Sequence, residues 1–535
     1  MKLDTVSFQI MWSRVVAIAD EMATTLVKTA FSHVVRENHD YACAIYDQHG
    51  RMLAQSTHCT PGHIGAMPQL MKSVLAIHPT ASFSEGDILV TNDPWIGAGH
   101  TPDYFMITPI FRKGGVIGFA VNSAHHVDSG GRLGAPDARD VYEEGLIVPI
   151  SHFQVSGQPN LELIALIRRN VRMSDKVLGD LRAQVSANFI GAQRVCELVD
   201  DLDTGDLALL AGAIIGFTES AMRKAIRAVP DGIYHARTTV HENAPFTIVL
   251  RLEVNGDDIH ADFTGTSAQV AAPINSVLNM TLAYTLFPIK CALEPHIPNN
   301  EGCAAPIRLT VPSGSILNAE FPAACMWRTS SVYYAIEVIF AALAQAVPDK
   351  VMAPSGTYPL WLSIFSGQMD DGRPYIIHLN AQGGQGARAH HDGVSTVVFP
   401  PNVMNTPVEV FELESTLICE RKALRPDSGG AGRHRGGLGQ EFVFRNAGRH
   451  DVVASLVGGR LAAGAEGMFG GLVGARGSIR VNGEPLQSSR QMILAADDRV
   501  ELLYPGGGGY GPPQDRDRES IRRDVENGFV SAAAA

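Results

Sequence analysis

Hydrophobic positions in the first 230 residues recur mostly at helical spacing. Between Asp4 and Ser32 they lie three or four residues apart, at Phe8, Met11, Val15, Ile18, Met22 and Leu26, and this period predicts an amphipathic helix. Helices are also expected over Met67–Ala76 and across most of Leu161–Met222, where Asn160 and Ser174 are suitable N-caps. Short apolar runs between these regions indicate strands, namely Tyr41–Tyr46, Asp87–Val90, Tyr104–Phe111 and Val116–Val121.

The pattern changes after about Gly232, where strand-like runs are interrupted by glycine and proline. A strand is expected at Thr247–Glu253, and helices return near Asn279–Leu293 and Ser331–Ala346. From about Gly383 the chain is dense in glycine, as in the runs that begin at Gly383, Gly429 and Gly506. Because glycine adopts backbone conformations closed to other residues, we interpret these runs as tight loops between β elements.

These patterns predict an α+β, multidomain protein with a helix-rich N-terminal half and a C-terminal half rich in strands and glycine. At 535 residues the chain is too long for one ordinary core. We expect an N-terminal α+β domain over residues 1–230, a central α+β domain over 231–380, and a mostly β, glycine-rich domain over 381–535.

Charge and cysteine content narrow the class of function. The net charge is -12 and no run of Lys or Arg exceeds two residues, so nucleic acid is not an expected partner. The seven cysteines form no CxxC pair, which favours a reducing compartment over a disulfide framework. No apolar stretch reaches the roughly 18 residues of a membrane span, and the N-terminal helix lacks the apolar core of a signal peptide. We therefore expect a cytoplasmic protein that acts on a small molecule.

Residues 92–128 gather histidines and carboxylates around two of the predicted strands. The two strands are joined by Arg112-Lys-Gly-Gly115, which is typical of a hairpin turn. With the turn centred on Gly114, Asp103 lies opposite His125 at the open end of the hairpin, and such neighbours lie about 4.5–5.5 Å apart at Cβ. Pro109 favours an edge strand or a bulge, either of which would alter the register.

His100, Asp103 and His125 together offer two imidazole nitrogens and one carboxylate oxygen. This donor set suits Zn²⁺, Mn²⁺ or Fe²⁺ and leaves coordination positions open for water or substrate. Each of the three residues alone is as easily a capped or solvated turn residue. The residue pattern therefore leaves both a metal site and an ordinary loop open.

Other candidate groups carry weaker signals. The pair Glu143-Glu144 could supply a general base, but adjacent acidic residues usually lie on a solvated face. The pair His390-His391 would point to opposite faces of a strand. His58 and His63 flank a cysteine and a proline, and we interpret them as part of a surface turn.

Several motifs together resemble the hydantoinase B family. They are Asn92–Trp95, Gly99–Asp103, Ala124–Asp128, Tyr142–Gly145 and Gly179–Gln184 in the first half, and Ala261–Gly265, Asn405–Glu409, Arg433–Gly437 and Tyr504–Tyr510 in the second. The resemblance covers nearly the whole chain, and the combination is specific although no single motif is. Many members have Tyr where this chain has Trp95, and Trp95 would change the pocket wall, so the substrate is not carried over.

The resemblance implies a division of labour between two subunits. The family includes ATP-dependent hydantoinases and N-methylhydantoinases, 5-oxoprolinases, caprolactamase-like enzymes, and acetone and acetophenone carboxylases. An A-type subunit with an actin-like ATPase fold uses ATP and Mg to phosphorylate the substrate, and a divalent metal is held by the B-type one. The absence of a GxxxxGK[ST] phosphate loop here agrees with the B-type role, although an actin-like ATPase would lack one too.

The resemblance also assigns residues. The family's metal ligands correspond to His100, Asp103 and His125, and Asp40 matches a fourth ligand or a residue close behind the ligands. A bound metal of this kind lowers the pKa of water towards about 7. The protons would be moved by a nearby acid or base, for which His126 and Glu144 are candidates.

We therefore expect the B-type subunit of a hetero-oligomeric, ATP-dependent hydantoinase-like amidohydrolase that opens a hydantoin- or lactam-like ring. The alternative is a subunit of an ATP-dependent ketone carboxylase, which dependence on bicarbonate would distinguish. A third, non-enzymatic hypothesis is a scaffold that organises the ATPase, and it predicts that turnover survives Asp103→Ala.

Overall fold

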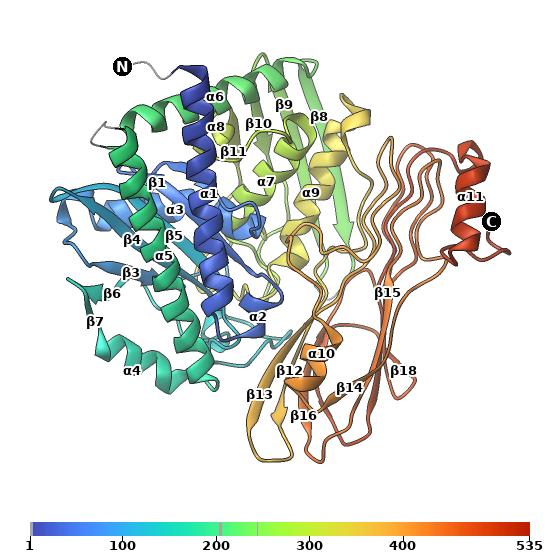
Figure 1. Cartoon of the computed structure of the whole chain (residues 1–535). Coiled ribbons are helices and arrows are strands. Elements are labelled where there is room, and N and C mark those ends of the chain that lie inside the picture. Colours follow the sequence, from blue (N-terminus) through green and yellow to red (C-terminus); the bar gives the residue numbers. More distant parts are fainter. Residues whose placement is uncertain (1–3, 203–205, 243) are drawn as a thin grey trace.

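The computed structural model describes residues 4–202, 206–242 and 244–535 (Figure 1). These residues form helices and four β-sheets, which confirms the α+β, multidomain architecture. The helices are α1 (Thr5–Thr29), α2 (His33–Arg36), α3 (Pro61–Ile77), α4 (Leu161–Asn170), α5 (Ser174–Leu202), α6 (Ala208–Arg227), α7 (Leu278–Leu293), α8 (Glu301–Ala304), α9 (Thr329–Leu343), α10 (Val408–Leu413) and α11 (Arg518–Glu526). The predicted helical stretch Leu161–Met222 corresponds to α4, α5 and α6, and its residues 203–205 lie outside the described part of the chain.

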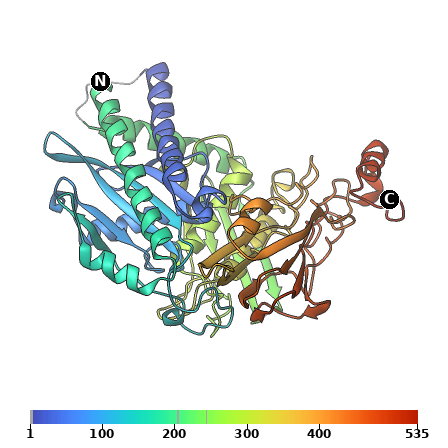
Figure 2. The same ribbon diagram turned by 60° about the horizontal axis from the view of Figure 1, so that its bottom comes forward.

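The first sheet has seven antiparallel strands in the order β2-β1-β5-β4-β3-β6-β7. Its strands are β1 (Tyr41–Asp47), β2 (Met52–Gln55), β3 (Ile88–Thr91), β4 (Asp103–Arg112), β5 (Gly115–His125), β6 (Ser151–Val155) and β7 (Gln158–Pro159). Alternate residues of β1 belong to two hydrophobic clusters, so this strand is buried on both faces. Helices α1 and α5 cover one face (Figure 2), and α3 packs on the other.

The second sheet follows the first in the chain, in the order β11-β10-β9-β8. Its strands are β8 (Gly232–Val240), β9 (Phe246–Asn255), β10 (Asp258–Asp262) and β11 (Ile307–Thr310). Every second residue of β9 from Phe246 to Val254 is buried, as expected for a sheet with one covered face. The hydrophobic side chains of α7 and α9 belong to the same cluster as these residues, and this cluster also contains residues of α3.

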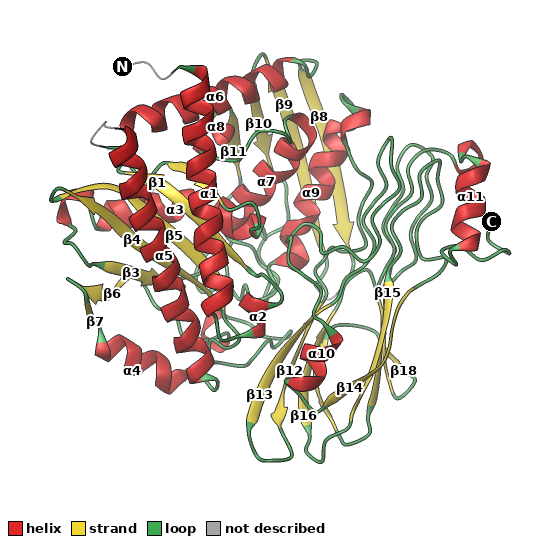
Figure 3. Ribbon diagram, viewed as in Figure 1, coloured by secondary structure: helices red, strands yellow, loops and turns green. Residues whose placement is uncertain are grey.

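The third and fourth sheets form a sandwich in the C-terminal part (Figure 3). They contain β12 (Leu362–Gln368), β13 (Pro374–Asn380), β16 (Val452–Val457) and β19 (Arg490–Leu494), and β14 (Leu417–Leu424), β15 (Gln440–Asn446), β17 (Ser478–Val481), β18 (Glu484–Leu486) and β20 (Arg499–Leu503). Phe365 of one sheet packs on Phe444 of the other, with ring centroids 5.2 Å apart. On the opposite face of the third sheet, Leu362, Ile364 and Ile376 belong to the cluster that includes α3 and α9. The C-terminal sandwich is therefore packed against the part of the molecule that holds the candidate site.

The glycine runs are extended segments that pack backbone against backbone, and not the tight loops that we predicted. They hydrogen-bond to one another outside regular strands, as from Gly507 N to the carbonyl of Gly437 at 3.0 Å. Neither Gly436 nor Gly507 has a positive φ. A Cβ on Gly436 would instead lie 1.9 Å from the carbonyl oxygen of Gly507. Glycine is required here because of close approach between segments, as at the crowded axis of collagen.

No described helix is both long and apolar enough to cross a bilayer. The domain boundaries at residues 230 and 380 stay a prediction.

Substitution of one packed glycine tests this explanation. We expect Gly436→Ala to destabilise the protein by about 1–3 kcal/mol or more, since the new methyl group overlaps a carbonyl of the neighbouring segment. The matched control is Gly212→Ala in α6, where a Cβ meets nothing within 4 Å and alanine stabilises a helix by roughly 0.5–1 kcal/mol. Urea unfolding followed by circular dichroism measures both, and equal midpoints for the two variants would contradict the explanation.

Candidate metal centre

The hairpin formed by β4 and β5 has the register that the sequence predicted. Asp103 pairs with His125 at its open end, and the pairing continues to Ile110, where a bulge between Ile110 and Phe111 shifts it. Because β4 lies between β5 and β3, Pro109 is not in an edge strand. The bulge next to it is the other outcome that a proline in a strand favours.

The side chains of His100, Asp103 and His125 meet at this end of the hairpin. Their potential ligand atoms all lie within 4.8 Å of one another, and all three residues are buried. His100 Nε2 is 2.7 Å and His125 Nδ1 is 2.9 Å from the same oxygen, Oδ1 of Asp103. Gly99, just before His100, has a φ of 85°, and a Cβ there would lie 2.6 Å from Arg328 Cδ. Glycine at this position therefore allows the tight loop that brings His100 to the hairpin.

The second nitrogen of His100 determines its tautomer. Nδ1 lies 3.1 Å from the carbonyl oxygen of Met326 and donates its proton there, which leaves a lone pair on Nε2. Burial, assisted by Arg328, lowers the pKa of His100 to about 3, so the ring is neutral at pH 7. His125 Nδ1 is hydrogen-bonded to the same oxygen of Asp103, and its Nε2 is buried without a partner. His100 Nε2, in contrast, makes no hydrogen bond despite its short distance to Asp103. Unprotonated nitrogen facing a carboxylate oxygen is the arrangement that ligands of one cation adopt.

The other oxygen of Asp103 contacts two side chains that the sequence analysis did not assign to the site. Oδ2 is 3.0 Å from His63 Nε2 and 2.9 Å from Arg328 Nη2. Burial alone would raise the pKa of Asp103, but the basic side chains around its oxygens, His63 among them, hold it well below the usual value. Burial would lower the pKa of His63, but the Asp103 carboxylate outweighs this effect, so the pKa of His63 is raised. The carboxylate is therefore ionised, and neighbouring side chains contact both of its oxygens.

The interpretation of His58 and His63 as a surface turn was wrong for His63, which is 2% exposed. Helix α3 begins at Pro61, and not at the predicted Met67, so that His63 lies in its first turn. Proline at the first helical position is a start signal, and this signal could have placed His63 in a helix, although not beside Asp103. Arg328 carries no comparable signal, because it precedes α9 and is 225 residues away from Asp103 in the chain.

Asp40, the predicted fourth ligand or neighbour of the ligands, lies beside the cluster. Its Oδ1 accepts a hydrogen bond of 3.0 Å from Thr60 Oγ1 and lies 3.8 Å from His63 Nε2. Its backbone carbonyl accepts the N–H of His125 at 3.0 Å, which fixes the end of β5. Asp40 lines a cavity of about 50 Å³ together with both histidines of the cluster, His63 and Arg328. That space admits water or a small substrate group, and the role of Asp40 as a ligand stays a prediction.

His126 is fully buried next to the cluster, with its ring fixed by α5 and β4. Its Nε2 is 3.0 Å from Gln184 Oε1, and its ring centroid is 4.7 Å from that of Tyr104. Burial lowers its pKa. It lines a second, smaller cavity of about 20 Å³ that also touches His100 and His125. Its role as an acid or base stays a prediction.

Glu144 is buried behind His100, whereas its neighbour Glu143 pairs with Arg132 near the surface. Glu144 Oε1 accepts hydrogen bonds of 2.7 Å from the backbone N–H groups of both Cys325 and Met326. The carbonyl of Met326 in turn accepts from His100, so Glu144 supports the segment that orients this ring. Burial raises the pKa of Glu144 to about 8. Its predicted role as an acid or base is not tested by this arrangement.

His378 is a further buried histidine that the sequence analysis did not single out. It lies on β13, and its ring centroid is 5.5 Å from that of His125. Its Nε2 lies 3.2 Å from the carbonyl oxygen of Val127. The C-terminal sandwich therefore contributes one wall of the site.

Trp95 does not form a wall of either cavity next to the cluster. Its Nε1 donates to the carbonyl oxygen of Ala319 at 2.8 Å, and its ring packs on Phe321. The expectation that Trp95 shapes the pocket therefore has no support at these two cavities.

Comparisons with known proteins agree over nearly the whole chain. The family model for hydantoinase B/oxoprolinase matches residues 4–513 of this chain. The chain is 31% identical to the B-type subunit of a putative D-/L-hydantoinase from a Pseudomonas species, over 100% of this chain and 94% of that one. It is 29% identical to the beta subunit of the caprolactamase from Pseudomonas jessenii, over 96% and 92% of the two chains. The crystal structure of the ATP-dependent caprolactamase from Pseudomonas jessenii superposes with a TM-score of 0.92 and 26% identity, covering 100% of this chain and 96% of that chain.

The pKa of Glu144 predicts a pH dependence of stability. Between about pH 5 and 8 the folded protein keeps a proton on Glu144 that the unfolded chain has released, so stability falls as the pH rises through this window. The slope from this group reaches about 1.4 kcal/mol per pH unit, and Glu144→Gln removes it. Glu143→Gln is the adjacent control. Its stability should fall with pH as steeply as that of the wild type, and more steeply than that of Glu144→Gln. Urea unfolding from pH 5 to 8 measures the three proteins, and parallel slopes for wild type and Glu144→Gln would refute the prediction.

Proposed function

Because this chain belongs to the hydantoinase B/oxoprolinase family, we propose that it is the metal-dependent subunit of an ATP-dependent cyclic-amide hydrolase. Its substrate is a hydantoin- or lactam-like ring, and its partner is an A-type ATPase subunit. The subunit role is supported by relatives that are named as the B-type component of a hydantoinase and the beta component of a caprolactamase. In the proposed reaction the partner transfers the γ-phosphoryl group of ATP to the amide oxygen. Water then cleaves the ring C–N bond, and the phosphoryl group leaves as phosphate.

The observation that carries this proposal is the convergence of His100, Asp103 and His125 in a buried site. Two imidazoles and one carboxylate fit Zn²⁺, Mn²⁺ or Fe²⁺ and leave positions open. The buried, unpartnered ring nitrogens of both histidines agree with this use. When bound, such an ion supplies Lewis acidity that makes water a nucleophile near neutral pH.

The residues around the ligands orient them and balance their charge. Arg328 and His63 engage Oδ2 of Asp103, so Oδ1, which faces His100 and His125, would be the oxygen offered to a cation. Met326 fixes the proton of His100 on Nδ1. Neighbours of this kind typically change metal affinity 10–100-fold when they are removed. Arg328 also lines the cavity, where its guanidinium can bind the anionic phosphorylated substrate.

Metal content tests the site directly. We expect about one transition metal per chain in the purified wild type, and its loss in Asp103→Ala, because this substitution removes the oxygen that both histidines approach. The matched control is His235→Ala, an exposed histidine of β8, which should keep the metal. Elemental analysis by mass spectrometry gives the ratio. A wild type that is free of metal and fails to take up Zn²⁺ or Mn²⁺ would disprove the site.

Turnover with the A-type partner, ATP and a series of cyclic amides tests the reaction. We expect Asp103→Asn to lower the rate by several orders of magnitude, whereas His235→Ala leaves it unchanged. Ring opening without bicarbonate supports the hydrolase. A requirement for bicarbonate would replace it with the carboxylase alternative, and undiminished turnover in Asp103→Asn would leave only the scaffold hypothesis.

The carboxylase alternative has one relevant structural likeness. The nucleotide-free structure of acetone carboxylase superposes with a TM-score of 0.88, covering 98% of this chain and 78% of that chain, at 20% identity. At this identity the likeness concerns the fold alone, so the hydrolase remains the proposed function.

A further inference from the structure

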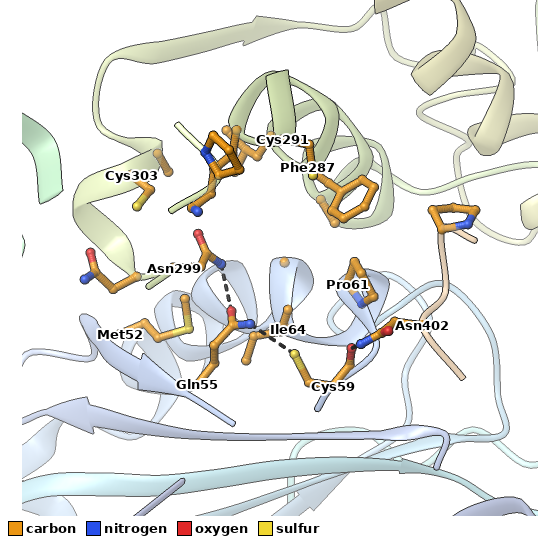
Figure 4. A pocket seen from close by; sticks show the side chains of 18 of the residues that line it. Met52, Gln55, Cys59, Pro61, Ile64, Phe287, Cys291, Asn299, Cys303 and Asn402 are labelled. Carbon is orange, nitrogen blue, oxygen red and sulfur yellow. Dashed lines mark hydrogen bonds between the residues drawn. The ribbon is translucent and has the colours of Figure 1, made fainter. Parts of the chain in front are cut away.

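Residues of α3 line two cavities that differ in size and in character. The pocket between α3 and α7, of about 360 Å³, is lined mainly by apolar side chains such as Ile64 and Phe287 (Figure 4). The cavity beside the candidate metal centre, here called the metal cavity, has a volume of only about 50 Å³. One buried water needs roughly 10–15 Å³ of such space. The metal cavity therefore admits a group of several non-hydrogen atoms.

Asn380, at the end of β13, is a buried amide whose side chain makes no hydrogen bond to any described residue. It is 4% exposed and lines the metal cavity. Its Oδ1 is enclosed and has no partner, whereas Nδ2, which also has none, is the part of the amide that is open to the cavity. Because buried polar groups normally make hydrogen bonds, the free N–H groups of Asn380 indicate an acceptor within the cavity.

The backbone of Asn380 is held by Thr406, a residue of the motif Asn405–Glu409. Thr406 N–H donates to the carbonyl of Asn380 at 2.7 Å, and Thr406 Oγ1 accepts the N–H of Asn380 at 2.9 Å. Asn380 is also paired with Leu362 of the neighbouring strand β12. The amide is therefore presented to the cavity by a fixed segment of backbone, as a binding site of precise geometry requires.

The start of α9 brings two further donors to the same cavity. Arg328 binds Asp103 through Nη2, and its Nη1 has no hydrogen-bond partner in the described part of the chain. The hydroxyl of Thr329, the first residue of α9, likewise lacks a partner among the described residues. Both residues line the metal cavity. The positive end of the α9 dipole lies there as well, and it favours a negatively charged group.

The three donor side chains, Arg328, Thr329 and Asn380, define the chemistry of the ligand. A lactam carbonyl offers one oxygen and a carboxylate offers two, whereas a phosphoryl group offers three strong acceptor oxygens and negative charge. Arginine is also a preferred partner of phosphate. The carboxylate of Asp40 lines the cavity too, but its Oδ1 accepts from Thr60 and lies 3.8 Å from His63 Nε2. The donors therefore outnumber the acceptors, which favours a phosphoryl group as the ligand.

We propose that Arg328, Thr329 and Asn380 form a phosphoryl subsite that holds the phosphorylated substrate beside the candidate metal ligands. Arg328 Nη1, Thr329 Oγ1 and Asn380 Nδ2 each donate to a phosphoryl oxygen. This inference rests on the proposed function, because the A-type ATPase subunit is the source of the phosphoryl group. It deepens that function by naming the residues that distinguish the phosphorylated substrate from the free cyclic amide.

Calorimetric titration with inorganic phosphate tests the subsite without ATP or the partner subunit. We expect saturable binding to the subunit as purified, and binding of acetate that is weaker by about tenfold or more, because acetate leaves one donor unpaired. Asn380→Asp replaces the open donor with a carboxylate oxygen and should weaken phosphate binding by about tenfold or more. Thermal unfolding of this variant shows whether the loss is local.

Thr329 provides a matched pair of substitutions that changes little besides the hydroxyl. Thr329→Val removes the donor and keeps the shape of the side chain, so it should weaken phosphate binding by roughly threefold or more. Thr329→Ser keeps the hydroxyl and should retain the affinity of the wild type. Equal phosphate affinity in the valine and serine variants would contradict the assignment of Thr329.

The outcomes separate this subsite from the proposed function. Phosphate binding that depends on Asn380 in a protein without metal supports the subsite, although the metal-dependent reaction would then fail its own test. The converse result, a subunit that contains metal and opens the ring but does not bind phosphate at millimolar concentration, overturns the subsite alone. Undiminished phosphate binding in Asn380→Asp, or tighter binding of acetate than of phosphate, would overturn it as well.

Discussion

The buried carboxylate of Asp103 is the interaction on which the organisation of the site depends. Its two oxygens meet His100 and His125 on one side and His63 and Arg328 on the other. These groups come from a loop, from β5, from the first turn of α3 and from the start of α9. Removing a carboxylate from water is costly unless charge and hydrogen bonds compensate for it. The four segments must therefore come together around Asp103 for the fold to hold it.

Hydrogen bonds of backbone groups fix how these segments are positioned around Asp103. The segment before α9 supplies Arg328 to Asp103 and the Met326 carbonyl to His100, and Glu144 holds the same segment through two backbone N–H groups. On the other side, the carbonyl of Asp40 fixes the end of β5. The geometry of the three candidate ligands thus follows from hydrogen bonds made by residues behind them, which is also how ligands are oriented in known metal sites.

The walls of the cavity beside the candidate metal centre are shared with other parts of the molecule. Residues of helix α3 and of the segment around Pro400 line both this cavity and a second pocket that lies between α3 and α7. The C-terminal sandwich contributes His378 to the wall of the candidate metal site. It also contains glycine segments that are packed backbone against backbone. Parts of the chain that are distant in sequence therefore build the walls, while the hairpin supplies two of the three candidate ligands.

The sequence by itself determined the structural features that depend on residues close together in the chain. The helical period of hydrophobic residues predicted α1, α7 and α9. The short turn fixed the register that places Asp103 opposite His125, because two strands joined by a few residues have few ways to pair. Only the tertiary structure decided the places of His63, Arg328, His378 and the buried Glu144, since these contacts join segments with no regular spacing between them. The glycine runs show the same limit. Their composition was visible in the sequence, but glycine is needed there to let distant backbones touch, and that requirement exists only once the segments are packed together.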